Sequence, residues 1–377
     1  MRKLAIIREI KEVREIPGAD NICLVIIDGW QCVAQKGEFV AGDACVYFEL
    51  DSILPDMPMF EFMRARKFRV RTIKCMKQLS QGLAKPISML KEFTGKTFKV
   101  GDDVTDIIGV KKHDPEAEDE LKITRPKPRL KWWQQILAKI PFIGRRYRRL
   151  TGAMPFPVHI VSKTDEERYQ NINPRLLAHW QGQEIEITEK VDGTSTTYIY
   201  KPKGGWFMPE EFMVCSRNQM LDKPDSSVYW EFARSQSIKE RMKALHAALN
   251  LPANGYLILQ GEIIAPNVQG NKYGVDCLKY YIFNMKSCNS KTRAAFQWIM
   301  TSATPHLSAL GFDCVPALFR GRCGSLDAIM QERQINSRSK LADTIAEGFV
   351  VRLADQNING MKSFKFIHPS FLLKHNL

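Results

Sequence analysis

The chain has 377 residues, 44% hydrophobic content and a formal net charge of +14, which predicts two or three globular domains and favours a polyanionic partner, most simply nucleic acid, over a membrane surface. Its nine scattered cysteines, odd in number and without a Cys-x-x-Cys pair, favour reduced thiols over a disulfide framework or a zinc site. The apolar run at the start is too short for a signal peptide, and no uncharged stretch approaches the ~18 residues of a membrane span, so we expect a soluble, cytoplasmic protein without a transmembrane segment.

Residues 1–110 are predicted to be rich in β-structure. Turn signals such as Pro17-Gly18 and Asp28-Gly29 separate short apolar runs, which are Leu4–Ile7, Ile22–Ile27, Val33–Ala34, Cys45–Phe48 and Val70–Ile73. Strands at this spacing predict a five-stranded OB-like β-barrel that binds nucleic acid. Its candidate phosphate contacts form a basic cluster, for which a solvated strand face is an equally good explanation taken alone: Arg66, Lys67, Arg69, Arg71 and Lys74.

Residues 111–155 are predicted to form a charged linker or insertion. An acidic patch comes first, and residues 121–150 then contain ten Lys or Arg and no acidic residue. Trp132, Trp133 and Ile136 lie at helical spacing, which predicts a short basic amphipathic helix. This helix could dock its tryptophans on a neighbouring domain, or lie on RNA or on a membrane surface.

Residues 156–377 alternate predicted strands and helices, which indicates an α+β domain with antiparallel sheets. The expected strands are Ile185–Ile187, Thr196–Tyr200, Phe212–Cys215, Leu257–Leu259, Tyr280–Phe283 and Gly348–Arg352. The expected helices are Trp230–Ser237, Ile238–Leu249, Thr292–Thr301 and Leu326–Ile335. No glycine-rich phosphate loop is present, so any phosphates must be held by side-chain cations.

Lys190 is the candidate nucleophile. It begins a Lys-x-Asp-Gly motif directly after the expected strand at Ile185–Ile187, as in enzymes that form a covalent lysyl–nucleotide. A free lysine has a pKa near ~10.4, so we expect burial and neighbouring cations to lower the pKa of Lys190. The alternative is a solvated lysine before a β-turn at Asp192-Gly193.

Further charged residues follow at the ends of predicted strands, in the order that nucleotidyl transfer needs. Arg217 could bind a phosphate or the ribose through two parallel hydrogen bonds, and Glu262 could accept hydrogen bonds from the ribose hydroxyls. Glu347 could bind a divalent cation, and Lys362 or Lys365 could neutralise the α-phosphate.

A flat base also needs a stacking partner, for which Phe283 is the best candidate, although taken by itself this residue is better explained as a core aromatic on a strand. Together these segments resemble nucleotidyltransferase motifs I, III, IIIa, IV and V of the covalent ligase superfamily. More narrowly, the chain resembles the ATP-dependent RNA ligases with an N-terminal OB domain, sometimes called family 5 RNA ligases. Segments such as Asp51-Ser52-Ile53-Leu54-Pro55 and Ser80-Gln81-Gly82-Leu83 are similar to the OB domain of that family.

The resemblance implies an OB domain over 1–110 and an adenylyltransferase domain of the ATP-grasp-like or ligase type over 156–377, with antiparallel sheets flanked by helices. It implies ATP and Mg²⁺ or Mn²⁺, with Glu347 as the metal ligand. It further implies that Glu189 helps to hold adenine, and that Asp192 and Gly193 shape the loop around Lys190. The partner would be RNA with nicked or broken ends, including RNA/DNA hybrids.

The implied reaction seals 3′-OH and 5′-phosphate ends through lysyl–AMP and an adenylated 5′-end. An ATP-dependent DNA ligase is the main alternative, although it usually carries its OB domain after the catalytic core. An RNA capping enzyme would use GTP. A non-catalytic RNA-binding protein with a ligase-like core would have lost Lys190 or its phosphate-binding cations, and none of them is missing.

Overall fold

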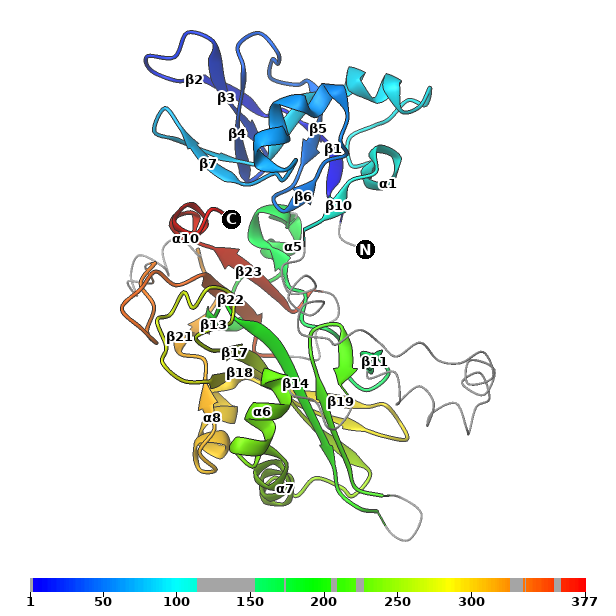
Figure 1. Cartoon of the computed structure of the whole chain (residues 1–377), viewed down its shortest axis with the longest axis vertical. Helices are drawn as coiled ribbons and strands as arrows, with labels where there is room; N and C mark the ends of the chain where they lie inside the picture. Colours follow the sequence, from blue (N-terminus) through cyan, green and yellow to red (C-terminus); the bar gives the residue numbers. More distant parts are fainter. Residues whose placement is uncertain are drawn as a thin grey trace. The chain divides into compact units, whose positions relative to one another are not determined.

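The computed structural model describes residues 3–113, 153–172, 174–204, 209–221, 227–325, 335, 337–355 and 361–377 (Figure 1). It divides into two compact units. Unit 1 contains Met1–Pro115, Arg168–Asn173 and Phe366–Leu377, and unit 2 contains Glu116–Glu167 and Pro174–Lys365. The basic helix predicted within 121–150 lies outside the described residues, as does nearly all of the helix predicted at Leu326–Ile335.

Unit 1 is built from short antiparallel strands, and each of the five predicted apolar runs overlaps one of them. Three sheets have the strand orders β1-β5-β9, β2-β3-β4 and β7-β8, and β6 pairs with β10. Two 3₁₀ helices, Pro58–Arg66 and Ile87–Glu92, and the helix α1 (Thr105–Ile108) connect them. The strands are β1 (Ala5–Glu9), β2 (Glu12–Glu15), β3 (Ile22–Ile27), β4 (Trp30–Gln35), β5 (Ala44–Phe48), β6 (Ser52–Ile53), β7 (Thr72–Cys75), β8 (Gln78–Gln81), β9 (Leu83–Pro86) and β10 (Lys111–Lys112).

Two segments that are distant in sequence complete the core of unit 1. Ile367 and Leu372, the latter in helix α10 (Pro369–Lys374), are buried in one hydrophobic cluster with Trp30. The Nε1–H of Trp30 donates a hydrogen bond to Asn171 at 2.8 Å. Both segments lie within 156–377, the range predicted for the adenylyltransferase domain. We therefore keep the predicted domain bounds as a proposal, with the addition that two segments of this range contribute to the core of unit 1.

Most residues of two larger sheets lie in unit 2. The eight-stranded sheet has the order β11-β16-β15-β14-β17-β18-β19, with β20 parallel to β18, and the five-stranded sheet has the order β12-β23-β22-β13-β21. The first sheet contains β11 (Ala153–Pro155), β14 (Thr194–Lys201), β15 (Glu211–Cys215), β16 (Gln219–Leu221), β17 (Gly255–Ile264), β18 (Lys279–Asn289), β19 (Ala295–Trp298) and β20 (Asp313–Cys314). The second contains β12 (Glu167–Arg168), β13 (Glu184–Lys190), β21 (Ala317–Arg322), β22 (Gly348–Leu353) and β23 (Ser363–Ile367).

Helices cover one face of the eight-stranded sheet. Their apolar side chains share a buried cluster with Tyr198, Tyr280 and Ile282 of the sheet. This arrangement of antiparallel sheets and flanking helices confirms the predicted α+β class. These helices are α6 (Val228–Ser235), α7 (Ile238–Ala248) and α8 (Met300–Ser308). Two shorter helices lie outside this cluster, α5 (Pro174–Ala178) in unit 2 and the 3₁₀ helix Tyr169–Asn171 in unit 1.

The helix predicted at Thr292–Thr301 is wrong. Residues 295–298 form β19, which pairs with β18 so that Trp298 lies opposite Met285. Helix α8 begins only at Met300. A short run rich in aromatic residues fits a pleated strand as well as a helix. Here the backbone pairing with β18 favours the strand.

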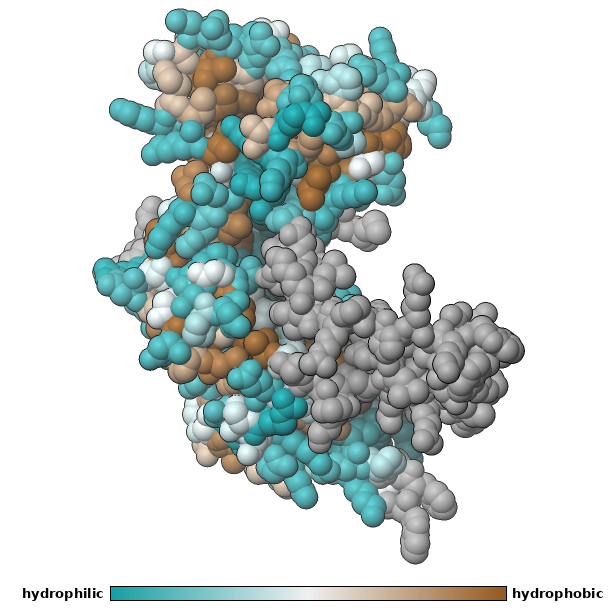
Figure 2. Space-filling model, in the orientation of Figure 1, coloured by the Kyte–Doolittle hydropathy of each residue, from teal (hydrophilic) through white to brown (hydrophobic). Residues whose placement is uncertain are grey.

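Hydrophobic residues on the surface are scattered between hydrophilic ones on the face that Figure 2 shows. No helix within the described ranges is long and apolar enough to cross a membrane.

A buried carboxylate joins β13 of the five-stranded sheet to helix α8. Glu186 on β13 is 1% exposed and accepts hydrogen bonds from the backbone N–H groups of Met300 and Thr301, at 2.7 and 2.6 Å. These are among the first N–H groups of α8, which lack partners within the helix. The negative charge also lies at the positive end of the helix dipole.

Replacing Glu186 with alanine should therefore lower the free energy of unfolding by about 2–4 kcal/mol, because two buried donors lose a charged acceptor. Denaturant unfolding followed by tryptophan fluorescence measures the change. Glu240→Ala, on the exposed side of α7, is the control and should cost less than about 1 kcal/mol. Equal stability of the two variants would contradict this role of Glu186.

Candidate active site

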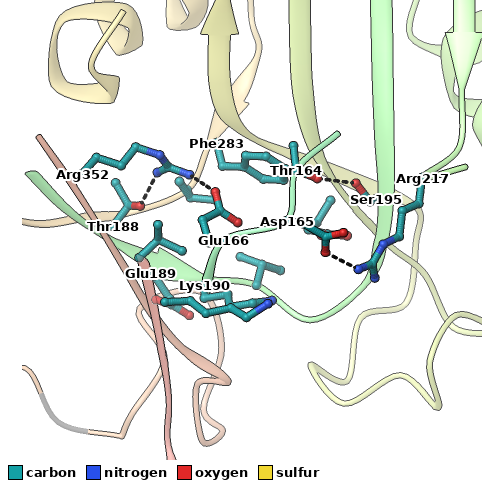
Figure 3. Close-up of a pocket in the computed structure, with 15 residues that line it drawn as sticks. Thr164, Asp165, Glu166, Thr188, Glu189, Lys190, Ser195, Arg217, Phe283 and Arg352 are labelled. Atoms are coloured by element: carbon teal, nitrogen blue, oxygen red, sulfur yellow. Dashed lines mark hydrogen bonds and ion pairs between the residues drawn. The ribbon is translucent and has the colours of Figure 1, made fainter. Parts of the chain in front are cut away.

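A pocket in unit 2 is lined by six of the ten residues predicted for the nucleotide site (Figure 3). Figure 3 shows Arg217 and Arg352 on opposite sides, with Phe283 and Lys190 between them. The lining residues are Thr164, Asp165, Glu166, Thr188, Glu189, Lys190, Val191, Ser195, Arg217, Glu262, Phe283, Val315, Val350, Arg352 and Lys365.

Lys190 occupies the last position of β13, where it pairs with Gly348 of β22. The chain then passes through Val191–Gly193 into β14 of the other sheet. A Cβ on Gly193 would lie 2.4 Å from the carbonyl oxygen of Ile263, so no side chain fits at this position. The glycine of the Lys-x-Asp-Gly motif is therefore required by the close approach of β17.

The amine of Lys190 donates a hydrogen bond to Glu347 at 2.6 Å. Burial by itself lowers the pKa of Lys190, but the charges of Glu347, Glu262 and Asp192 outweigh burial and raise the pKa well above its usual value. The expectation that neighbouring cations lower this pKa is therefore wrong for the ligand-free protein. In this state the amine is protonated at neutral pH and cannot act as a nucleophile.

Asp192 is fixed by two contacts from outside the motif. Its carboxylate forms an ion pair with Lys272, and its backbone N–H donates to the hydroxyl of Tyr273 at 3.2 Å. These contacts hold the loop between the two sheets in one conformation. Lys272 and Tyr273 were not predicted as site residues, and no sequence pattern marks them, because they approach the loop only in the folded chain.

Glu189 lies on the pocket wall, but its carboxylate is already engaged. Ser339 donates its hydroxyl to one oxygen, and the backbone N–H of Lys340 donates to the other at 2.8 Å. Burial raises the pKa of Glu189, and these two hydrogen bonds oppose the rise. The contact between Glu189 and adenine stays a prediction. It requires either that the hydrogen bonds to Ser339 and Lys340 rearrange or that the backbone of Glu189 makes the contact.

Two arginines line the pocket, each paired with a carboxylate. Arg217 contacts Asp165 at 2.6 Å, and Arg352 contacts Glu166 at 3.2 Å. Burial acts to raise the pKa of Glu166, but positive charges led by Arg352 hold it below its usual value. Arg352 was not predicted as a site residue, although a charged residue on an otherwise apolar predicted strand is a usable signal.

The two candidate phosphate-binding lysines are separated. Lys365 lines the pocket that contains Lys190, whereas Lys362 lines an adjoining pocket. Phe283 lines the first pocket and also packs with Val191 and Val315 in a small hydrophobic cluster. Both explanations given for Phe283 from the sequence, a pocket wall and a packed aromatic, therefore hold for its position.

The carboxylates near Lys190 suit a hard divalent cation that is bound by few protein groups. Glu347, Glu262 and Asp192 all act on the amine electrostatically. Within the described residues, no group of three or more His, Cys, Asp or Glu side chains is arranged to hold a metal. This donor set therefore fits Mg²⁺ or Mn²⁺ only with most of the ion's waters retained, which is the usual behaviour of Mg²⁺.

The predicted nucleic-acid contacts in unit 1 differ in exposure. Arg66, Lys67 and Lys74 are exposed. Arg69 is buried and contacts Asp51 at 2.7 Å, and Arg71 is half-buried with a pKa lowered mainly by burial. The first three are therefore the ones that solvent, and hence a phosphate backbone, can reach.

Comparison with known proteins gives matches over both parts of the chain. A family model described as an OB-fold domain matches residues 4–87, and one described as RNA ligase matches residues 183–367. The search of curated proteins gives no match. The fold and the matched regions together define a ligase-type nucleotidyltransferase with an N-terminal OB-fold domain.

Solved structures of the RNA ligase of Naegleria gruberi are similar over the whole chain. A lysine-to-methionine variant with AMP and Mn has 30% sequence identity and a TM-score of 0.73, covering 100% of this chain and 99% of that one. A structure with ATP and Mn has 28% identity and a TM-score of 0.73, covering 99% of each chain. A structure with pyrophosphate has the same identity and TM-score, covering 100% and 99%. The chain belongs to the RNA ligase family.

Glu347→Gln should lower the pKa of Lys190 by about one pH unit or more, because the protonated amine loses its nearest negative charge. NMR titration of ¹³C-methylated lysines measures this, with the Lys190 signal identified by its loss in Lys190→Ala. Glu211→Gln removes the partner of a different lysine, Lys201, and should leave the Lys190 titration unchanged. An unchanged Lys190 titration in Glu347→Gln would contradict the electrostatic account.

Proposed function

We propose that this RNA ligase is ATP-dependent and joins 3′-OH to 5′-phosphate ends at nicks in duplexes whose 3′-OH strand is RNA. The observation that carries the proposal is the position of Lys190, at the end of a strand in a pocket that also holds Arg217, Glu262 and Lys365. The ATP, AMP, pyrophosphate and Mn named for the Naegleria gruberi structures support the nucleotide and the metal.

In the first step, the Lys190 amine loses a proton and its nitrogen attacks the α-phosphorus of ATP. The bond from this phosphorus to the bridging oxygen breaks, pyrophosphate leaves and a lysyl–AMP phosphoramidate forms. The ion pair with Glu347 opposes this step, because it stabilises the protonated amine. Glu347 must therefore release Lys190 before attack, after which burial favours the neutral amine.

Glu347 is the residue that would hold a divalent cation, with Asp192 and Glu262 nearby. When bound, this cation neutralises phosphoryl oxygens during in-line displacement. Binding through Glu347 also gives a physical reason for the release of Lys190, since a carboxylate that is engaged elsewhere no longer stabilises the ammonium. Metal binding and activation of the nucleophile are coupled in this proposal.

The other pocket residues position the nucleotide. Lys365 neutralises the α-phosphate, and Arg217 binds phosphate or ribose after leaving Asp165. Glu262 accepts hydrogen bonds from the ribose, and Phe283 stacks on the base. Asp192 and Gly193 hold the loop, and Glu189 supports the adenine side of the pocket.

The second and third steps use the RNA ends. AMP passes from Lys190 to the 5′-phosphate, which frees the amine and gives an adenylated end. The 3′-hydroxyl then attacks this end, a phosphodiester forms and AMP leaves. The OB-fold domain grips the duplex beside the break through Arg66, Lys67 and Lys74, since exposed basic side chains supply most of the affinity for a phosphate backbone.

Lys190→Ala should abolish the covalent label that the protein retains after incubation with α-labelled ATP and Mg²⁺ followed by denaturation. Lys201→Ala is the control, because Lys201 is also a buried lysine paired with a carboxylate in unit 2 but lies outside the pocket. Label retained by the Lys190 variant would contradict the assignment of the nucleophile.

The triple variant of Arg66, Lys67 and Lys74 to alanine should keep adenylylation but weaken the sealing of nicked RNA, more so at higher salt. Loss of three phosphate contacts should also reduce the slope of log affinity against log salt by about 2–3. Electrophoretic binding assays across a salt series measure the slope. Triple substitution of Lys3, Lys36 and Lys91, elsewhere on unit 1, is the control. Equal slopes in the two variants would argue against the predicted RNA surface.

A further inference from the structure

A second pocket adjoins the nucleotide pocket and has no role in the proposal so far. The two pockets share Arg352 and the segment 164–166 as a common wall. The second pocket is otherwise lined by residues 162–163, by β18 and β19, and by residues 362–363 at the start of β23. Because the wall is shared, a group attached to a ligand in the first pocket lies within reach of the second.

The second pocket has an excess of positive charge. Among the described residues that line it, Lys163, Lys286, Lys362 and Arg352 are cationic, and only Asp165 and Glu166 are anionic. Both carboxylates are already paired, Asp165 with Arg217 at 2.6 Å and Glu166 with Arg352 at 3.2 Å. Both carboxylates are therefore shared with arginines, and Glu166 offsets only part of the positive charge around Lys286.

Lys286 is the most unusual of these lysines. Its side chain is partly buried on β18, and no hydrogen bond or ion pair joins its amine to any residue in the described part of the chain. Burial, together with the charges of Arg352 and Lys362, lowers the pKa of Lys286 to about 8, although the charge of Glu166 opposes this effect. An ammonium held in this way is destabilised by its surroundings, and an incoming anion would relieve that destabilisation.

The floor of the pocket is rigid and offers amides in place of carboxylates. The side chain of Gln260 donates to the carbonyl oxygen of Ser162 at 3.1 Å, and Asn284 donates to Gln260 at 3.0 Å. Gln297 in turn donates to Asn284 at 3.1 Å. This chain of hydrogen bonds joins β17, β18 and β19 to the segment that carries Lys163, and so fixes the spacing of the cations.

We propose that the second pocket is a phosphate subsite in which Lys286, with Lys163 and Lys362, binds a phosphate group beside the nucleotide. The proposal rests on the proposed ligase function and extends it, because it assigns a binding role to Lys286. The phosphate belongs either to the pyrophosphate end of ATP or to the 5′-end of the RNA. Both present the same chemistry to three lysines.

The test uses the full-length protein and compares Lys286→Met with Lys286→Arg, which keeps the charge. Preformed adenylylated enzyme is mixed either with pyrophosphate, which reverses the first step, or with 5′-phosphorylated nicked RNA, which accepts the AMP. The concentration that gives half-maximal discharge is measured for each. Lys279→Ala, at the far end of β18 and outside both pockets, is the matched control.

Lys286→Met should raise one of these concentrations by roughly tenfold or more, as expected for loss of a charge-assisted contact, and Lys286→Arg should restore it. A change in the pyrophosphate arm alone assigns the subsite to the leaving group, and a change in the RNA arm alone assigns it to the 5′-phosphate. In the wild type, the affected concentration should also rise as the pH increases through about 8, because neutral Lys286 cannot attract the anion, and Lys286→Arg should remove this rise.

Values within twofold of wild type in both arms for Lys286→Met would overturn the subsite. A variant that melts at a lower temperature than Lys279→Ala and loses both arms, without rescue by Lys286→Arg, would also overturn it in favour of a structural role. Failure of the wild-type protein to form any adenylylated enzyme is a different outcome, which counts against the proposed function itself.

Discussion

The ion pair between Lys190 and Glu347 is the interaction on which the chemistry of the site depends. It joins the end of β13 to the residue just before β22, two strands that pair directly beside it. In the ligand-free protein it keeps the amine charged, so the nucleophile is stored in an unreactive form. Burial of the Lys190 amine favours its neutral form, but the charge of Glu347 outweighs this effect. When a ligand draws Glu347 away, burial then favours the neutral amine.

The surrounding fold explains why this pair lies at a pocket. Lys190 ends a strand of one sheet, and the chain enters the other sheet within four residues, through a loop that requires glycine at position 193. Lys272 and Tyr273 fix this loop, and Glu186 fixes α8 against β13. The reactive amine is thus held by rigid strands, as a site that must place an amine against a phosphorus atom requires.

Much of this could be predicted from the sequence because the motifs stand at the ends of strongly patterned strands. Lys190, Arg217 and Glu262 could each be assigned to the site from that pattern, which left Lys362 and Lys365 as alternatives for the phosphate contact. The raised pKa of Lys190 could not be predicted, since it depends on a carboxylate 157 residues away. The same holds for the pairing of Glu189 with Ser339 and for the strand at 295–298, which only the neighbouring strand β18 specifies.

The central claim is that one lysine forms a covalent bond to AMP. Peptide mass spectrometry of the wild-type protein, after incubation with ATP and Mg²⁺ and digestion under conditions that preserve phosphoramidates, tests it directly. The account predicts a single AMP adduct on the peptide that contains Lys190, with fragment ions that place it on that residue. An active preparation without such an adduct, or with AMP on another side chain, would contradict the account.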